Sequence, residues 1–289
     1  MNRRAVGASA LVAIAFASGG ARATGHGPVY GLATPTLAEG GWSLDVSAMY
    51  RQMGDAGDVN GHAAMLRPML GYGITEDLQL SFSVPVPIYT HPGLRTARMM
   101  GMMTAAPDAE GLLTWRFQRN GNDVGSRIES TALLGLEYPS DSVRAGVRTA
   151  PGFLVGGVTG YASRSVYAWA GALYRRYQTP LGPSADHPGD LLFYSLVVGY
   201  RPEMFRQELP HADWRFFVEA VGEWTGRDRI AGRAVVDSGG NHILVGPTVL
   251  GLFGSWGISG GPMFVAYSKL NGTQREDRLR FVTNYTYWF

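Results

Sequence analysis

Charged side chains recur at every second or fourth position in several apolar segments of this 289-residue chain. Between residues 213 and 223 they include Arg215, Glu219 and Glu223, and apolar residues occupy the alternate positions. Alternate residues of a strand face opposite sides of a sheet, so these charges would share one face. Rings of charged side chains make pores selective, whereas buried charges of both signs survive as ion pairs. The pattern therefore predicts either a selective constriction or an internal ion-pair lattice.

The same alternation selects charges of both signs along the rest of the chain. A charge on the lipid face costs about 2 to 4 kcal/mol at mid-bilayer, so in a membrane barrel all of them would face the lumen. The lumen and selectivity candidates are Arg67, Arg116, Arg127, Glu129, Arg175, Arg215, Glu219, Glu223 and Arg280.

Two features could bind a metal ion. Cleavage after Ala23 would make His26 the third residue, and a free amine, two backbone amides and an imidazole can hold Cu(II) or Ni(II) in a square plane. Thioethers suit Cu(I), although runs of Met also form adaptable apolar surface. The thioether candidates are Met99, Met100, Met102 and Met103. Both features suggest a barrel that handles copper or another heavy metal.

Other chemistries lack their residues. The chain contains no Cys, which excludes disulfides, thiolate metal sites and cysteine nucleophiles. Lys269 is its only Lys and no Gly-rich phosphate loop accompanies it, so neither nucleotide chemistry nor a nucleic-acid partner is expected. No His has a Ser two residues later, which argues against a lipid-facing hydrolase. We expect neither enzymatic activity nor a cofactor.

The elements that would position these side chains are strands. Gly accounts for 40 residues, aromatic residues for 11% and charged residues for 17%, which disfavours helices and suits pleated surfaces. Period-2 alternation predicts an all-β, antiparallel up-and-down transmembrane β-barrel of twelve strands. The expected strands are 41–51, 62–73, 78–88, 109–118, 126–138, 151–162, 165–177, 190–200, 212–225, 241–252, 256–267 and 278–289.

Residues 1–23 have the pattern of a cleaved secretory signal, with Arg3 and Arg4 before an apolar core and Ala21-Arg22-Ala23 at its end. Its removal would leave 22 basic and 23 acidic residues, so the formal charge would change from +2 to −1. We expect residues 24–40 to form an amino-terminal periplasmic segment and residues 41–289 to form the barrel. This organisation predicts export to the outer membrane of a Gram-negative cell.

The predicted connections and the last strand favour a membrane barrel. Tight turns near 74–77, 162–164 and 253–255 alternate with longer loops, one of them near 52–61, as in barrels with short periplasmic turns. The connection near 201–211 is too long for this rule. Tyr285, Tyr287 and Phe289 share one parity and end the chain, which resembles the signal by which outer-membrane barrels are recognised for insertion.

The stretch from Gly71 to Ser81 (GYGITEDLQLS) is similar to a strand-turn-strand element of outer-membrane barrels assigned to the meta-pathway of phenol degradation (MetA-pathway). Residues 28–42 resemble their entry into the first strand. The resemblance implies an outer-membrane channel or transporter for small solutes, with hydrophobic or aromatic compounds as cargo. The expected partners are outer-membrane lipids, lipopolysaccharide, the barrel-insertion machinery and the solute.

Three functions stay open at this stage. A channel for small solutes is the first, a copper-handling barrel with a closed lumen is the second and a lipid-facing hydrolase is the third. Twelve strands leave limited room, because barrel diameter grows with strand number. Long side chains such as Tyr167, Trp169, Arg175 and Phe217 could fill the lumen.

The barrel prediction is tested by gel mobility without prior boiling. A closed barrel retains its hydrogen-bonded wall in cold detergent, so unboiled and boiled protein should migrate at different positions. A mobility that does not change on boiling would contradict the barrel.

Overall fold

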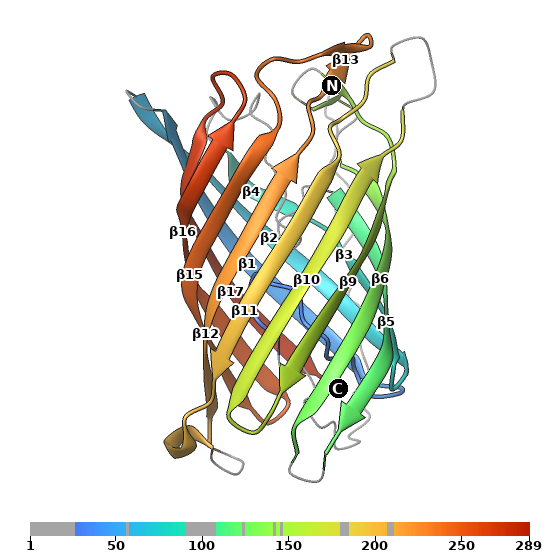
Figure 1. The fold of residues 1–289 in the computed structure, drawn as a ribbon, viewed down its shortest axis with the longest axis vertical. Coiled ribbons are helices and arrows are strands. Elements are labelled where there is room, and N and C mark those ends of the chain that lie inside the picture. Colours follow the sequence, from blue (N-terminus) through green and yellow to red (C-terminus); the bar gives the residue numbers. More distant parts are fainter. Residues whose placement is uncertain are drawn as a thin grey trace, which may run out of the picture.

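The computed structural model describes residues 27–55, 58–90, 108–122, 125–140, 143–144, 147–179, 185–206 and 211–289. In these residues the chain forms one antiparallel sheet that closes on itself through the pairing of β1 (Trp42–Asp55) with both β2 (Asp58–Thr75) and β17 (Glu276–Trp288). Figure 1 shows the resulting tall barrel of tilted strands. The prediction of an all-β, twelve-stranded antiparallel barrel is confirmed.

The wall strands follow the chain order around the barrel. One wall position is split in two, because Pro85 interrupts the strand between β3 and β4, which both pair with β2. The remaining elements are β3 (Leu78–Ser83), β4 (Val86–Thr90), β5 (Asp108–Gly121), β6 (Arg127–Pro139), β9 (Gly152–Ala162), β10 (Val166–Tyr177), β11 (Leu191–Tyr200), β12 (Asp213–Thr225), β15 (Gly240–Phe253) and β16 (Trp256–Leu270). Two short hairpins, β7 (Val143–Arg144) with β8 (Val147–Arg148) and β13 (Arg229–Ile230) with β14 (Arg233–Ala234), lie outside the wall.

The two ends of the barrel differ. At one end, here called the turn end, the Trp42 N–H donates to the Phe289 carbonyl (2.8 Å) and the Phe289 N–H donates back (3.1 Å). Gly254 and Ser255 alone link β15 to β16 at this end, which lies at the bottom of Figure 1. The opposite end, here called the loop end, carries the long connections. Short turns face the periplasm in outer-membrane barrels, so the turn end is the periplasmic end.

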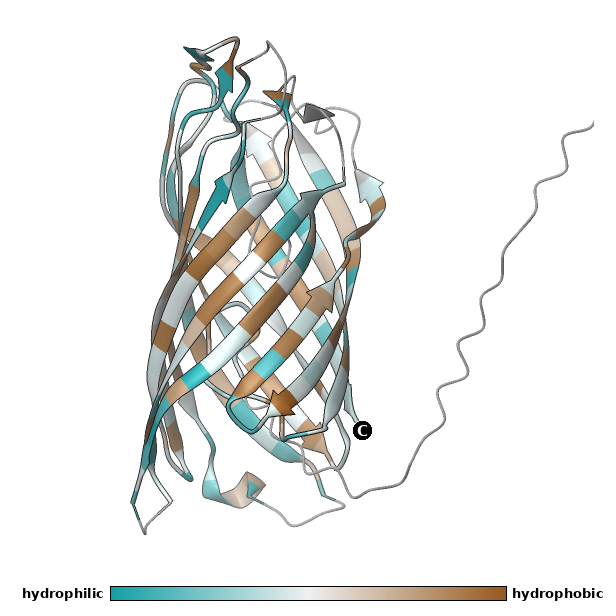
Figure 2. Ribbon diagram, turned by 90° about the vertical axis from the view of Figure 1, so that its right-hand side faces the viewer, coloured by the Kyte–Doolittle hydropathy of each residue, from teal (hydrophilic) through white to brown (hydrophobic). Residues whose placement is uncertain are grey.

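Alternation along the strands separates lipid-facing from lumen-facing residues. The apolar side chains of Phe82 (55% exposed), Leu136 (72%) and Val218 (59%) point outward, while charged residues of the opposite parity are buried inside. In Figure 2 apolar residues recur at intervals along the tilted strands. An apolar outer surface is the surface that a bilayer requires of a β-barrel. Among the described residues, no helix has the length and apolar character needed to cross a membrane.

Two connections differ from the expectation. The predicted long loop at 52–61 is wrong, because β1 extends to Asp55, β2 begins at Asp58, and Met53 pairs with Gly61. The long connection at 201–212 contains the short 3-10 helix η2 (Glu203–Phe205) at the turn end. It is tied to the wall by the ion pair between Arg201 Nε and Asp213 Oδ1 (2.6 Å). Extra length at this end therefore forms a small ordered cap.

The described loops at the loop end are tied together by backbone hydrogen bonds. The N–H groups of Ala231 and Arg148 donate to the Asp186 carboxylate at 3.0 and 3.1 Å. These two hydrogen bonds lower the pKa of Asp186 below its ordinary value, because they stabilise the charged form. His187 and Arg229 exchange N–H to carbonyl bonds of 2.9 and 2.8 Å. The hairpin of β13 and β14 is thus fastened to the neighbouring loop.

Candidate functional site

Residues 27–41, here called the inner segment, enter the barrel, with residues 27–37 inside the lumen and residues 38–40 exposed beside the turn between β2 and β3. Tyr30, Leu32 and Thr34 are 1%, 4% and 1% exposed. The expected periplasmic segment, residues 24–40, is therefore placed differently in its described part, which occupies the lumen. Alternation analysis could not show this, because the segment is not a strand and its position depends on partners far away in the sequence.

Glu219 on β12 anchors the start of the inner segment. Its Oε1 accepts a hydrogen bond from the N–H of Val29 (2.8 Å), and its Oε2 accepts from the N–H groups of Tyr30 (2.8 Å) and Gly31 (2.7 Å). The hydroxyl of Thr248 also donates to this carboxylate. Hydrogen bonds to charged groups contribute about 1.5 to 3 kcal/mol each to stability, so these four bonds offset the free-energy cost of burying the Glu219 carboxylate. Glu219 is therefore a structural anchor in this state and not an exposed pore charge.

The middle of the segment follows the inner wall past β11, β10 and β6. The N–H of Leu32 donates to Ser195 Oγ (3.0 Å) on β11. Thr34 Oγ1 donates to Glu129 Oε2 (3.0 Å) on β6 and accepts from Trp169 Nε1 (3.1 Å) on β10. These hydrogen bonds occupy the polar groups of Ser195, Glu129 and Trp169, which would otherwise contact solute or water in the lumen.

The end of the segment is bound beside the turn between β2 and β3. Thr36 Oγ1 donates to the Glu76 carbonyl (2.6 Å), and the N–H of Leu37 donates to Gln79 Oε1 (2.9 Å). A Cβ atom at Gly73 would lie 2.0 Å from the Ala38 carbonyl oxygen, so only Gly permits this approach of segment and wall. The inner segment thus lines most of the lumen circumference in the turn-end half of the barrel.

One ion-pair cluster lies in the loop-end half of the lumen, on the side of β12, β15 and β17. Arg280 Nη1 lies 2.6 Å from Glu223 Oε1, and Arg280 Nη2 lies 2.5 Å from Asp277 Oδ2. Arg51 pairs with the other oxygen of Asp277, and His242 Nε2 lies 3.1 Å from Glu223 Oε2. This group, here called the Arg280 cluster, is less than one tenth exposed throughout.

Three members of the Arg280 cluster, Arg51, His242 and Asp277, are not among the nine candidates, and for Asp277 the reason is a local failure of parity. The pairing of β1 with β17 shifts between Gln52 and Met53, so that Leu279 pairs with Gln52 and Asp277 pairs with Met53. Strict alternation would place Asp277 on the lipid face with Leu279, and the irregularity turns it inward. His242 was expected near a strand end, where β15 does begin. No sequence signal identifies the irregularity in advance.

A second cluster lies across the lumen. Arg175 Nε on β10 lies 2.7 Å from Glu137 Oε2 on β6, and its Nη2 lies 4.0 Å from Glu110 Oε2 on β5. Arg67 Nη2 on β2 lies 3.4 Å from the same Glu110 oxygen. Glu110 and Glu137 are cross-strand partners on β5 and β6, and Arg67 on β2 and Arg175 on β10 flank them, so that the two cations lower the cost of burying the two carboxylates.

Three further candidates gather at Glu129, near the turn end. Arg116 Nη1 lies 3.4 Å and Arg127 Nε lies 2.9 Å from Glu129 Oε1. The Arg127 side chain is 33% exposed and is the least buried of the nine candidates. Arg215 stands apart from all these clusters: its Nη2 donates to Asp213 (2.7 Å), and its guanidinium lies 5.4 Å from the centre of the Tyr167 ring.

Eight of the nine predicted lumen residues are less than one tenth exposed inside the barrel, and Arg127 lies at its rim. Arg215, Glu219 and Glu223 all face the lumen from β12. Each of the three has different partners, and the backbone N–H groups that Glu219 contacts belong to the inner segment. In the described state the geometry is that of a paired lattice.

Aromatic side chains fill the lumen beside the inner segment. The rings of Tyr167 and Trp169 stack at 5.5 Å, and both contact Phe217 at 6.1 and 6.2 Å. All three are at most 5% exposed. The expectation that long side chains occupy the interior is therefore met, and the Trp169 indole also holds Thr34.

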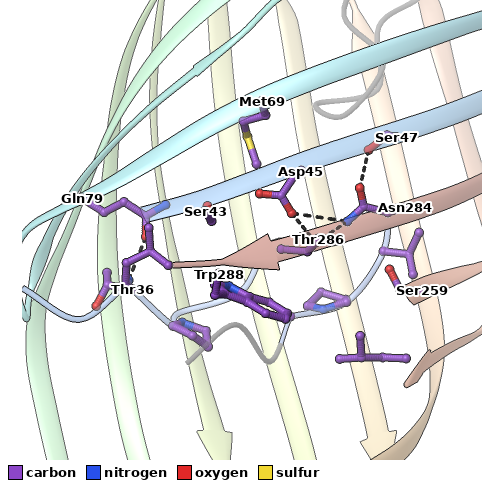
Figure 3. Close-up of a pocket in the computed structure, with 16 residues that line it drawn as sticks. Thr36, Ser43, Asp45, Ser47, Met69, Gln79, Ser259, Asn284, Thr286 and Trp288 are labelled. Atoms are coloured by element: carbon purple, nitrogen blue, oxygen red, sulfur yellow. Dashed lines mark hydrogen bonds between the residues drawn. The ribbon is translucent and has the colours of Figure 1, made fainter. Parts of the chain in front are cut away.

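A cavity of about 240 Å³ lies between the inner segment and the turn-end parts of β1, β15, β16 and β17. Its polar side includes Asp45, Asn284 and Thr286, which are connected by hydrogen bonds in Figure 3. Its apolar side includes Leu37 and Trp288.

The residues of the predicted insertion signal lie at the turn end. Tyr285 is 44% exposed, and Tyr287 and Phe289 contact each other with ring centres 5.8 Å apart. Phe289 also stacks on Trp42 at 6.4 Å across the closing strand pair. Aromatic residues at this level correspond to the girdle that membrane barrels place at the bilayer interface.

The metal candidates His26, Met99, Met100, Met102 and Met103 lie outside the described residues. Within the described ranges, no group of three or more His, Asp or Glu side chains could hold a metal ion. On the outer face, His62 Nδ1 is bonded to the Tyr50 hydroxyl at 2.6 Å and not to a serine.

The closed wall, the apolar exterior and the charged interior define a barrel of the outer-membrane type. The chain is similar to the COG4313 outer membrane channel from Pseudomonas putida F1, with a TM-score of 0.62 and 12% identity over 89% of this chain and 98% of that one. It is also similar to the NanC porin, with a TM-score of 0.51 and 10% identity over 84% and 98%. No protein-family model and no curated protein matches the sequence. At sequence identities this low, the similarity shows a shared fold and nothing more.

The Arg280 cluster should be a major source of stability. Replacing Arg280 by Met leaves Glu223 and Asp277 buried without their shared cation, and breaking a buried pair costs about 3 to 5 kcal/mol. Arg233→Met changes an exposed side chain on β14 and should cost less than about 0.5 kcal/mol. Urea unfolding of both variants in lipid vesicles, followed by gel mobility, measures the difference. Equal midpoints would show that the cluster carries no net stability.

Proposed function

We propose that this protein is an outer-membrane channel for small solutes whose path is narrowed by its own inner segment. The observation that carries the proposal is the binding of that segment to the lumen wall. Backbone N–H groups of the segment donate to Glu219, and Thr34, Thr36 and Leu37 form further hydrogen bonds with wall residues. None of these contacts belongs to the wall ladder, so the segment can leave the lumen while the barrel stays closed.

The path would run through the cavity beside the inner segment. From the turn end, a solute would pass Trp288 and Asp45 and then meet the charged clusters of the loop-end half. A barrel of twelve strands has little spare diameter, so the inner segment controls the width of this path. Displacement of the segment would open the turn-end half and expose Glu219 and Glu129 to the lumen.

The cargo that we propose is hydrophobic or aromatic. The resemblance of residues 71–81 and 28–42 to barrels of the meta-pathway of phenol degradation supports this cargo. The stacked rings of Tyr167, Trp169 and Phe217 support it further, because aromatic rings pair favourably at such distances and would contact solute once the segment moves.

The role of the inner segment is tested with two glycine variants. A Cβ at Gly31 would lie 2.3 Å from Val197 Cγ2, whose branched side chain cannot turn away, so Gly31→Val should displace the segment. Gly111 on β5 has open space around its Cβ position and supplies the control Gly111→Val. In planar bilayers we expect single-channel conductance to rise severalfold for Gly31→Val only.

Unboiled gel mobility should show that both glycine variants retain the barrel. An unchanged or lower conductance in a correctly assembled Gly31→Val protein would contradict control of the path by the inner segment. Wild-type and variant proteins that all fail to conduct would contradict the channel itself.

The cargo is tested by osmotic swelling of vesicles that contain the Gly31→Val protein. Phenylalanine and glutamine barely cross pure lipid, and they differ in whether the side chain can stack on aromatic rings. We expect faster entry of phenylalanine, because Tyr167, Trp169 and Phe217 favour an aromatic partner. Trp169→Leu should remove this preference and leave glutamine entry unchanged. Equal rates in the parent protein would contradict an aromatic cargo.

A further inference from the structure

The cavity beside the inner segment has one polar and one apolar side. In Figure 3, Asp45, Ser47 and Asn284 lie along one side, while Met69 and Trp288 lie on others. Among the described residues, the lining contains no Lys, Arg or His, and Asp45 is its single acidic residue. The cavity therefore combines one negative charge with an apolar surface.

Among the described residues, the Asp45 carboxylate has neither a cationic partner nor a set of backbone N–H donors. Glu129 and Glu223 are paired with guanidinium groups, and Glu219 accepts three backbone N–H bonds. The described donors to Asp45 are neutral side chains: the Thr286 hydroxyl and the Asn284 amide (3.5 Å), which both reach Oδ1, and the Ser43 hydroxyl. In the described parts of the chain it forms no ion pair with Lys, Arg or His.

An uncompensated carboxylate in a water-poor lumen favours a cationic ligand. An isolated buried charge is costly, and an opposite charge that also donates hydrogen bonds offsets this cost. Calcium and magnesium need several oxygen ligands, often more than one carboxylate, and would leave the apolar side unused. An anion would meet the Asp45 charge with no lining cation to offset it. An organic ammonium matches both sides of the cavity.

We propose that this cavity binds small organic amines, with the ammonium group at Asp45 and the apolar body against Trp288, Leu37 and Met69. Ser43 and Ser47 flank Asp45 on β1 and can accept further N–H bonds. A volume of about 240 Å³ suits a one-ring amine and is smaller than pockets for drug-sized ligands, which begin at roughly 300 Å³. This inference rests on the proposed function and deepens it, because it names a solute class for the same path.

Calorimetry on the protein in detergent micelles tests the proposal with benzylamine, benzyl alcohol and benzoate as probes. The three share one ring and differ in charge. We expect benzylamine to bind at least about tenfold more tightly than benzyl alcohol, which corresponds to 1.4 kcal/mol. Benzoate should bind most weakly, because its carboxylate meets Asp45. Equal affinities for the three probes in the wild-type protein would overturn the amine site without any variant.

Asp45→Asn preserves the shape and removes the charge, so benzylamine affinity should fall to that of benzyl alcohol. Asp237→Asn is the matched control, because Asp237 lies at the loop end and accepts from Thr273 at 2.8 Å, away from the cavity. Trp288→Leu should weaken benzylamine and benzyl alcohol to the same extent. Unchanged benzylamine affinity in an assembled Asp45→Asn protein would overturn the proposal.

The binding measurement separates this inference from the channel. Binding in micelles requires no conduction, so an amine site in a protein that does not conduct would leave the inference standing and overturn the channel. A conducting protein that binds the three probes equally would overturn the inference and leave the channel standing.

Discussion

The hydrogen-bonded closure of β1 onto β17 is the constraint on which the rest of this molecule depends. A strand in lipid has no water to satisfy its N–H and C=O groups, so the wall must pair with itself all the way round. The ladder from Ser43 and Trp288 to Gly54 and Glu276 provides this pairing at the seam. Closure also divides every strand into a lipid side and a lumen side, and charged residues follow to the inside because lipid rejects them.

The crowded interior follows from that division. A twelve-stranded wall encloses a narrow space, and the Arg, Glu and Asp side chains directed into it must find partners there. The Arg280 cluster and the group around Arg175 and Glu137 satisfy most of these charges strand to strand. Glu219 is satisfied differently, by backbone N–H groups of a segment that is not part of the wall. The N–H bonds that offset the cost of burying the Glu219 carboxylate therefore also position the inner segment.

The proposed path for solutes is the space that the wall charges and the inner segment do not occupy. Its cavity contains Asp45, whose described partners are all neutral, together with Trp288 and Leu37. The Arg280 cluster and the group around Arg175 lie in the loop-end half of the lumen, whereas the turn-end half holds the inner segment and the cavity beside it.

The sequence by itself determined the strand order, the position of each wall strand to within a few residues and the inward side of nearly every charge. It could do so because alternation has a period of two and depends only on neighbours along the chain. Tertiary structure alone decided that residues 27–41 enter the lumen, that Glu219 binds them and that Asp277 turns inward at a register shift. Those features depend on contacts between residues as many as 250 positions apart, which no local pattern records.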